Sequence, residues 1–156
     1  CIVAVVVYGI VHDQITARIC LEYFTVFHPP VFATQSPTLL AIGWGIIATW
    51  WAGAIIGTLL AISSRIGSRA KLTAHDLSPM VFRLLLVMAF CAMLFGTIGY
   101  FKGTMPAAFY NLIPVARHRR FLADWWAHNA SYGSGFLGGI ALCVIICYRR
   151  IRSASS

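Results

Sequence analysis

The sequence predicts an all-α integral membrane protein: a bundle of about four transmembrane helices with a partly extended outer loop packed on the helix tops. The first observation is composition, since 60% of the 156 residues are apolar and 10% are charged, against about 25% charged residues in soluble domains. The second is that several apolar runs are long enough for a helix to cross the hydrocarbon layer. The third is that basic residues stand at the ends of these runs.

The charge balance agrees with a membrane protein and excludes other classes. Twelve Lys and Arg residues against four Asp and Glu residues give a formal net charge of +8. Because these basic residues flank apolar runs, we interpret them as membrane-flank charges, with the lipid bilayer as a partner and no nucleic acid. The composition also excludes a disordered tail, a collagen-like repeat and a disulfide scaffold.

We treat 1–156 as a single transmembrane domain whose first span is incomplete. The apolar run 2–11 is too short to cross a bilayer alone, and the chain begins at Cys1 rather than at an initiator Met. Residues 1–11 are therefore predicted to be the end of a truncated first span. A cleaved signal peptide and a lipid-bearing Cys1 are the alternatives.

Three complete spans follow. The span 38–62 carries no charge, the span 80–101 carries Arg83 near its start, and the span 121–148 carries Asp124 and His128 near its start. Each reaches the length of about 20 mostly apolar residues that a transmembrane helix needs.

The segments between the spans fall on two sides of the membrane. The outer loops are 12–37 and 102–120, and the inner side has the loop 63–79 and the tail 149–156. Seven Lys and Arg residues lie at or near the inner side and five at the outer side. The positive-inside rule therefore predicts that both ends of the chain are cytoplasmic.

The first outer loop is predicted to be partly extended. Apolar and polar residues alternate along 15–23, which is typical of a half-buried strand or an extended plug against the helix tops. Pro29 and Pro30 follow His28 and restrain the backbone there to an extended turn.

Two spans carry stripes of small residues at four-residue spacing. Such stripes let helix backbones approach closely, and in lipid this contact drives helix packing. We expect the two helices to pack tightly, against each other or against a partner. The stripes consist of Gly45, Thr49, Gly53 and Gly57 in the span 38–62, and of Ser131, Gly135 and Gly139 in the span 121–148.

Most acids and histidines gather on the outer side, and the last span holds the most informative pair. Asp124 and His128 are four residues apart and share one helix face, with Tyr132 one further turn along. His128 lies about 10 Å below the interface if Phe121 marks it. Ionisable side chains at that depth normally face protein or a water-filled cavity, so this pair indicates a candidate site.

Short motifs spread over most of the chain carry a resemblance. They are Tyr8-Gly9, His12-Asp13-Gln14, Glu22-Tyr23-Phe24, His28-Pro29-Pro30, Gly43-Trp44-Gly45, Ala48-Thr49-Trp50-Trp51 and the stretch from Phe121 to Tyr132. These motifs resemble those of a group of small, uncharacterised bacterial four-span integral membrane proteins. The resemblance implies a protein of the bacterial inner membrane and brings no activity with it.

The outer cluster has three interpretations. The first is a metal site, because His and carboxylate together suit Zn, Fe, Mn or Cu. The spacing matches no metal-binding signature. The candidate ligands are Asp124, His128, Glu22, His12, Asp13 and His28.

The second interpretation is a tetrapyrrole site, with His128 as the axial ligand of a haem or a chlorin. The third, which we favour, is a buried polar network that clasps the loop to the helix tops. On that interpretation the protein is a non-catalytic accessory or assembly subunit of a bacterial inner-membrane complex, rather than an enzyme. Its partners would be other membrane subunits or a second copy of the chain.

Overall fold

The computed structural model of the chain describes residues 1–67 and 70–152. Ser68, Arg69 and residues 153–156, which belong to the predicted inner loop and inner tail, lie outside the described residues. The predicted all-α fold is confirmed, since the described residues form helices and no β-strand. Among the described residues, four helical segments are long and apolar enough to cross a membrane: Ile2–Ile19, Pro37–Ser63, Ala74–Lys102 and Val115–Ile151.

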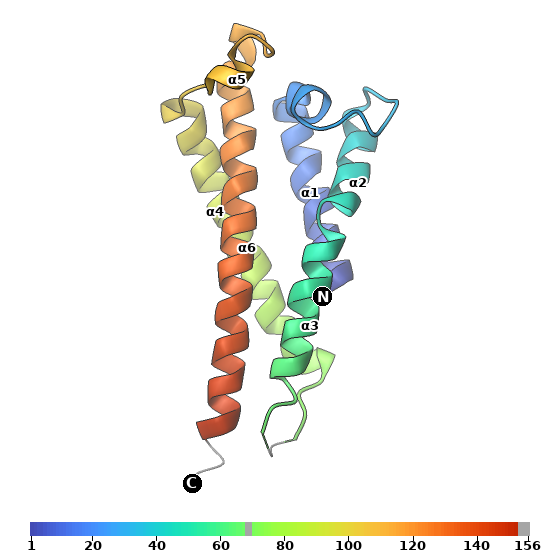
Figure 1. Ribbon diagram of the computed structural model, residues 1–156, viewed down its shortest axis with the longest axis vertical. Helices are drawn as coiled ribbons and strands as arrows, with labels where there is room; N and C mark the ends of the chain where they lie inside the picture. Colours follow the sequence, from blue (N-terminus) through green and yellow to red (C-terminus); the bar gives the residue numbers. More distant parts are fainter. Residues whose placement is uncertain (68–69, 153–156) are drawn as a thin grey trace.

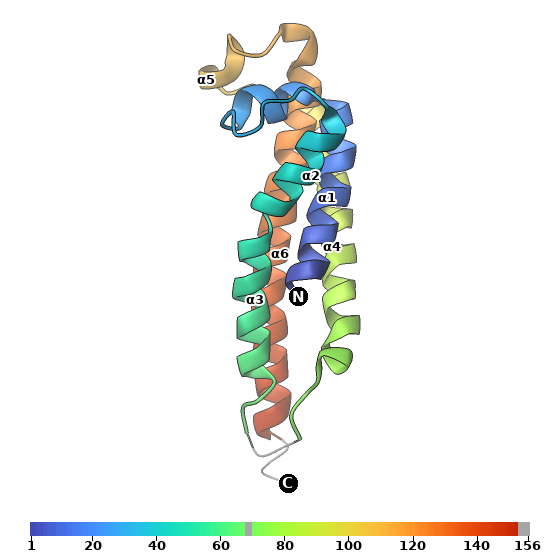
Figure 2. The ribbon, with the colours of Figure 1, turned by 90° about the vertical axis from the view of Figure 1, so that its right-hand side faces the viewer.

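The helices associate in two groups. Helix α1 (Ile2–Ile19) lies along α2 (Pro37–Ile47) and α3 (Trp50–Ser63), and α4 (Ala74–Lys102) packs along α6 (His118–Arg152) (Figures 1 and 2). The π-helix η1 (Tyr23–Phe27), the short α5 (Ala107–Tyr110) and the 3₁₀ turn η2 (Val115–Arg117) lie at one end of the bundle. We call this the upper end, and it is formed by segments 20–36 and 103–117.

Local sequence signals explain where the helices begin. Ser36 precedes α2, and its side chain accepts a hydrogen bond from the Leu39 backbone N–H, with Pro37 in the first turn. Thr73 and Asp76 form a capping box at the start of α4, in which each side chain bonds to the other residue's backbone N–H. Both caps satisfy backbone donors that a helix leaves unpaired.

The predicted strand over 15–23 is wrong. Helix α1 continues through Ile19, and the chain then turns into η1. Burial follows helical spacing and not the alternation, since the consecutive residues Thr16 and Ala17 are both buried and Ile15 is 59% exposed. A helix forms the backbone hydrogen bonds within the segment itself, whereas an unpaired strand beside lipid leaves its backbone N–H and C=O groups without partners. Within this loop the residues without helix are Cys20, which has an extended backbone, and 28–36.

The predicted span 38–62 is two helices that meet at Ala48 and Thr49. The Thr49 hydroxyl donates to the Gly45 carbonyl oxygen, and Thr49 has a φ of −121°, outside the helical range. A hydroxyl that bonds back to the previous turn often bends a helix. The bend places Thr49 beside α1, where its side chain would be in contact with a Cβ at Gly9.

The small residues of the span Pro37–Ser63 face α1. A Cβ at Gly45 would lie 2.6 Å from Ile10 Cα, one at Gly53 would lie 2.9 Å from Ile2 Cα, and one at Gly57 would lie 2.8 Å from Cys1 Cβ. The close approach expected of this stripe is therefore made to α1 rather than to the small residues of α6.

The stripe on α6 is divided among three neighbours. The Ser131 hydroxyl bonds to Tyr8 of α1. Gly135 faces the flexible end of Met88 in α4, and Gly139 faces Ile56 in α3. The backbone of α6 is approached closely at Gly99 of α4, where a Cβ would lie 2.5 Å from the Leu122 carbonyl oxygen.

The buried hydrophobic core lies at the upper end, where η1 and the loops cover the helix ends. Its buried members are mostly aromatic or small apolar side chains, and the ring of Tyr23 contacts those of Phe24 and Phe121. They are Ala17, Cys20, Tyr23, Phe24, Leu40, Ala41, Trp44, Ile113 and Phe121.

Candidate metal centre

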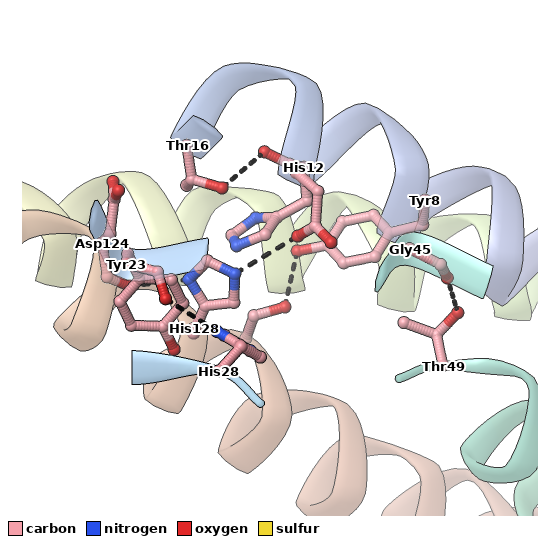
Figure 3. A network of polar contacts seen from close by, with 11 residues as sticks. Tyr8, His12, Thr16, Tyr23, His28, Gly45, Thr49, Asp124 and His128 are labelled. Carbon is pink, nitrogen blue, oxygen red and sulfur yellow. Dashed lines mark hydrogen bonds and ion pairs between the residues drawn. The ribbon is translucent and has the colours of Figure 1, made fainter. Parts of the chain in front are cut away.

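Three of the predicted ligands meet between α1 and α6, directly below the upper core. His12 and Asp13 are neighbours on α1, and His128 reaches them from α6, more than a hundred residues away in the sequence. One ligand atom from each residue lies within 4.8 Å of the others. Asp13 and His128 are buried, and His12 is half-buried. Figure 3 shows the rings of His12 and His128 beside each other between α1 and α6.

The hydrogen bonds of His128 determine which ring nitrogen is free. Nδ1 lies 2.7 Å from the backbone carbonyl oxygen of Asp124, one helical turn earlier. A carbonyl oxygen only accepts, so Nδ1 carries the proton, and Nε2 of the neutral ring has a lone pair. Nε2 in turn lies 3.2 Å from Asp13 Oδ1. Two acceptor atoms at this distance repel each other unless a proton or a metal cation lies between them.

His12 completes the cluster with an unpartnered nitrogen. Its ring meets the His128 ring edge-on, with centroids 4.5 Å apart and planes at 83°. The Nε2 atom is buried and has no hydrogen-bond partner among the described residues. A buried polar atom without a partner is costly, and in native structures it often marks a site for a ligand, an ion or a water molecule.

Aromatic side chains from η1 close the site at the upper end. The Tyr23 ring stacks on the His128 ring at 4.5 Å, and Phe24 meets the same ring edge-on at 5.9 Å. Both residues are at most 4% exposed. Burial raises the pKa of the Tyr23 phenol, so that it stays protonated. Water from the upper side therefore meets an apolar cover over the imidazole.

On the opposite side the cluster lines a cavity of about 440 Å³. The cavity lies among α1, α3, α4 and α6, and apolar side chains form most of its wall. Near the cluster it is bordered by a hydrogen-bonded pair, the Tyr8 hydroxyl and the Ser131 hydroxyl, whose oxygens are 2.8 Å apart. The His and Asp side chains thus face a largely apolar space within the bundle.

Asp124 supplies its backbone to the site and not its side chain. Its carboxyl group is completely buried, and neither oxygen has a hydrogen-bond partner in the described part of the chain. The Cys20 backbone N–H lies close to this carboxyl group, but it donates to the Thr16 carbonyl oxygen at 3.0 Å. In Figure 3 the carboxyl group lies apart from the rings of His12 and His128.

Glu22 lies in a different set of contacts above the site. Its Oε1 is 3.4 Å from Arg117 Nε, and its Oε2 accepts from the Cys20 thiol at 3.3 Å. Burial raises the pKa of that thiol to about 12, so Cys20 supplies no thiolate at neutral pH.

His28 packs in the upper core. Its Nδ1 lies 2.8 Å from the Tyr23 carbonyl oxygen, and its ring contacts those of Phe24 and Trp44. Burial lowers the pKa of His28, which keeps the ring neutral. The structure therefore brings together His12, Asp13 and His128 and places the other three candidates elsewhere.

Two residues of the site, Tyr8 and Tyr23, were not predicted from the sequence as functional candidates. Tyr8 is one helical turn before His12, and this i, i+4 spacing is a signal that would have identified it. Tyr23 follows Glu22 in a segment that the alternating pattern assigned to a strand, so its stacking on His128 had no signal in the sequence.

Comparison of the chain with protein families, with curated proteins and with solved structures finds no match. The chemistry of the side chains therefore has to indicate the function.

Proposed function

We propose that this polytopic membrane protein binds a transition-metal ion inside the bundle through His12, Asp13 and His128. One observation carries the proposal. His128 Nε2 faces Asp13 Oδ1 at 3.2 Å while its Nδ1–H is held by the Asp124 carbonyl oxygen. A metal-bound His almost always donates its other ring N–H to a carbonyl or carboxylate, which fixes the tautomer and aims the free nitrogen.

The spacing of the three atoms suits one ion. Ligands bound tetrahedrally at about 2.0–2.1 Å lie about 3.4 Å apart, close to the 3.2 Å between His128 and Asp13. The three ligand atoms all lie within 4.8 Å of one another, and a ligand pair needs about 3.4 Å, so His12 has to move by at most about 1.4 Å to complete the set. Rotation of its side chain provides that movement without a change in α1.

Two imidazoles and one carboxylate favour Zn²⁺ or Fe²⁺ among the metals considered. Catalytic zinc sites and non-haem Fe(II) sites both use two His and one carboxylate and leave at least one coordination position open. The protonated Cys20 thiol gives no soft ligand that would select Cu(I). The open position would face the cavity, because the aromatic cover lies on the other side.

A structural role is the second candidate. The 3.2 Å contact that suits a metal pair also suits a hydrogen bond through a shared proton, and it joins α1 to α6. On this account the contact is a clasp, and the chain is an accessory subunit of a bacterial inner-membrane assembly. We do not propose the tetrapyrrole site, because Asp13 lies 3.2 Å from the nitrogen that would ligate the macrocycle.

Metal content distinguishes the two candidates. The chain is purified in mild detergent without chelator, and bound transition metal is measured by inductively coupled plasma mass spectrometry. The proposal expects about one ion per chain, lost at least tenfold in His12→Gln, Asp13→Asn and His128→Gln. Glu22→Gln is the matched control and keeps the metal, because Glu22 pairs with Arg117 above the site.

Folding of each variant is checked by size-exclusion chromatography and circular dichroism. A folded wild-type chain that holds no metal, even after incubation with Zn²⁺ or Fe²⁺, contradicts the proposal. The structural clasp is then the remaining candidate. Equal metal content in Glu22→Gln and the three ligand variants contradicts it as well.

A further inference from the structure

We propose that a groove at the upper end of α4 and α6 binds one anionic phospholipid of the surrounding bilayer. The lipid phosphate would lie beside Lys102 and Arg119, with an acyl chain along α6. The groove has a volume of about 460 Å³, and its lining comes from α4, from the segment that follows α4 and from α6. None of the proposed metal ligands lines it, so this inference is independent of the metal proposal.

The wall of the groove is mainly aromatic and aliphatic. The rings of Phe95 in α4 and Trp126 in α6 stack with their centroids 6.5 Å apart. Both rings line the groove, and their residues are 42% and 36% exposed. The groove is therefore open on the outside of the bundle, where lipid surrounds membrane-crossing helices.

The length of the groove suits an acyl chain. On α6 the lining extends from Leu122 to Ala130, which is about 12 Å at the helical rise. The hydrocarbon of one leaflet is about 15 Å thick, half of the bilayer core. An acyl chain that lies along α6 thus stays against the groove for most of its leaflet.

Two donors in the groove match the oxygens of a phospholipid. The Thr104 hydroxyl and the Trp126 indole N–H line the groove, and neither donates a hydrogen bond within the described part of the chain. Ester carbonyl and phosphate oxygens only accept hydrogen bonds, so both donors can bond to a lipid at the level of its headgroup. Trp side chains are enriched at this level of membrane proteins for the same reason.

Helical spacing places a basic residue above each side of the groove. Lys102 is seven residues after Phe95 in α4, and it is exposed. Arg119 is seven residues before Trp126 in α6, and it is exposed as well. Residues seven apart lie about two turns apart on one face of a helix. Each basic residue therefore lies on the groove side of its helix, toward the upper end.

The ends of α4 and α6 that carry these residues are in contact. Gly103 directly follows Lys102, and Leu122 is three residues after Arg119. A Cβ at Gly103 would lie 3.3 Å from Leu122 Cβ. Two positive charges at neighbouring helix ends repel each other, and a phosphate between them turns this repulsion into two charge-assisted contacts.

The chain itself supplies no carboxylate to the groove. It has four acidic residues in all, and none of them lines the groove. Asp13 and Asp124 are buried, and Glu22 pairs with Arg117. Asp76 belongs to the capping box at the other end of α4. The positive charge above the groove therefore requires a counter-charge from outside the chain.

This charge selects the occupant. An anionic phospholipid such as phosphatidylglycerol brings one net negative charge to the two cations. Phosphatidylethanolamine carries its own ammonium group, which would add a third cation beside them. An apolar helix of a second copy would cover the groove and leave both cations without a counter-charge. We therefore commit to the anionic lipid.

The test uses the full chain, purified in detergent and delipidated. Native mass spectrometry measures the binding of phosphatidylglycerol and of phosphatidylethanolamine with the same acyl chains over a range of lipid concentrations. We expect saturable binding of one phosphatidylglycerol per chain and at least tenfold weaker binding of phosphatidylethanolamine. Glycerol 3-phosphate has the phosphate without the acyl chains, and at equal concentration it should not displace the lipid.

Two double variants remove the same charges at opposite ends of the bundle. Lys102→Gln combined with Arg119→Gln should weaken phosphatidylglycerol binding at least tenfold. Lys71→Gln combined with Arg83→Gln is the matched control, because it also removes one exposed Lys and one exposed Arg. These two residues lie before α4 and near its start, toward the end of the bundle opposite the upper end (Figure 1). The control should keep the wild-type affinity for the lipid.

A second pair of variants tests the wall of the groove. Ala130 lines the groove, so Ala130→Leu should fill it and weaken phosphatidylglycerol binding at least tenfold. Gly133→Leu is the control, because no described atom lies within 4 Å of a Cβ placed at Gly133. If Ala130→Leu does not fold, Thr104→Phe fills the groove from the segment after α4.

Four results would overturn the inference. The first is equal affinity for the two phospholipids, and the second is phosphatidylglycerol binding that is unchanged in the folded Lys102→Gln, Arg119→Gln chain or in a folded groove-filling variant. The third is displacement by glycerol 3-phosphate, which would reveal a phosphate site without a lipid. The fourth is a dimer that binds no lipid and dissociates in Ala130→Leu, which would assign the groove to a second copy. None of these results depends on whether the chain holds a metal ion.

Discussion

The ring of Tyr23 lies flat against the ring of His128, with centroids 4.5 Å apart and planes inclined by 30°. The contact joins η1 at the upper end to α6 within the bundle. It covers one side of the imidazole whose Nε2 faces Asp13. The loop between α1 and α2 is thereby part of the site and does more than connect two spans.

Removal of the Tyr23 ring should loosen both the upper core and the site. Tyr23→Ala is expected to lower the free energy of unfolding by about 3–5 kcal/mol, as buried aromatic truncations do. Tyr23→Phe keeps the stacked ring and should retain metal content and most of the stability. Detergent-based thermal unfolding and metal analysis measure both. Equal behaviour of the two variants would show that the stacking has no role.

The buried carboxyl group of Asp124 should be dispensable. Its oxygens have no partner in the described residues, and the contact to His128 comes from its backbone. Replacing a buried polar group by an apolar one of similar shape is often neutral or stabilising. Asp124→Leu is therefore expected to keep the bound metal and to match or exceed the wild-type melting temperature. Loss of metal in this folded variant would make the side chain a ligand.

Two glycine-to-alanine changes should have opposite effects on stability. A Cβ at Gly99 would meet the Leu122 carbonyl oxygen at 2.5 Å, so Gly99→Ala forces α4 and α6 apart at a cost of about 1–3 kcal/mol. At Gly133 the Cβ enters open space, and the higher helix propensity of Ala stabilises by up to about 1 kcal/mol. Thermal unfolding in one detergent measures both. A stable Gly99→Ala variant would contradict the close α4–α6 approach.

His28 should make the protein less stable in acid. Burial lowers the pKa of His28 in the folded state, below the unfolded value of about 6.5. The stabilisation is complete above the unfolded pKa and is lost as the pH falls below it toward the folded value, because the unfolded chain then binds the proton more readily.

The comparison with His28→Asn isolates this effect. Asn keeps a donor for the Tyr23 carbonyl oxygen and does not titrate. Nearby groups such as His128 and Asp13 are present in both proteins. The melting temperature between pH values of about 7 and 5 should therefore fall less in the variant than in the wild type. An equal fall in both would exclude His28 as the source.

The fold class was predictable because it depends on quantities that a sequence displays directly. Apolar runs of sufficient length, with charges at their ends, leave few alternatives to membrane-crossing helices. Local structure was less predictable where a sequence pattern conflicts with the requirements of the membrane. The alternation along 15–23 suits a strand, yet Thr16 and Ala17 are buried together on one helix face, because the requirement for internal backbone hydrogen bonds outweighs the pattern.

The sequence predicted the residue types that form the site, but it predicted less well which of the candidate residues belong to it. Asp124 and His128 share a helix face, but the i, i+4 bond uses the Asp124 backbone and leaves its carboxyl group elsewhere. The approach of His12 and Asp13 depends on how α1 packs on α6, and no periodicity in the sequence encodes that contact. The small-residue stripes predicted close packing, but they did not predict which helices would be the neighbours.

X-ray absorption spectroscopy of the zinc-loaded chain tests the central claim most directly. Two imidazole nitrogens and one carboxylate oxygen from the protein, at about 2.0–2.2 Å, are expected around the ion, with one imidazole lost in His12→Gln and one in His128→Gln. A first shell with sulfur ligands, or one that is unchanged in both folded variants, would contradict the assignment of His12, Asp13 and His128 as the metal site.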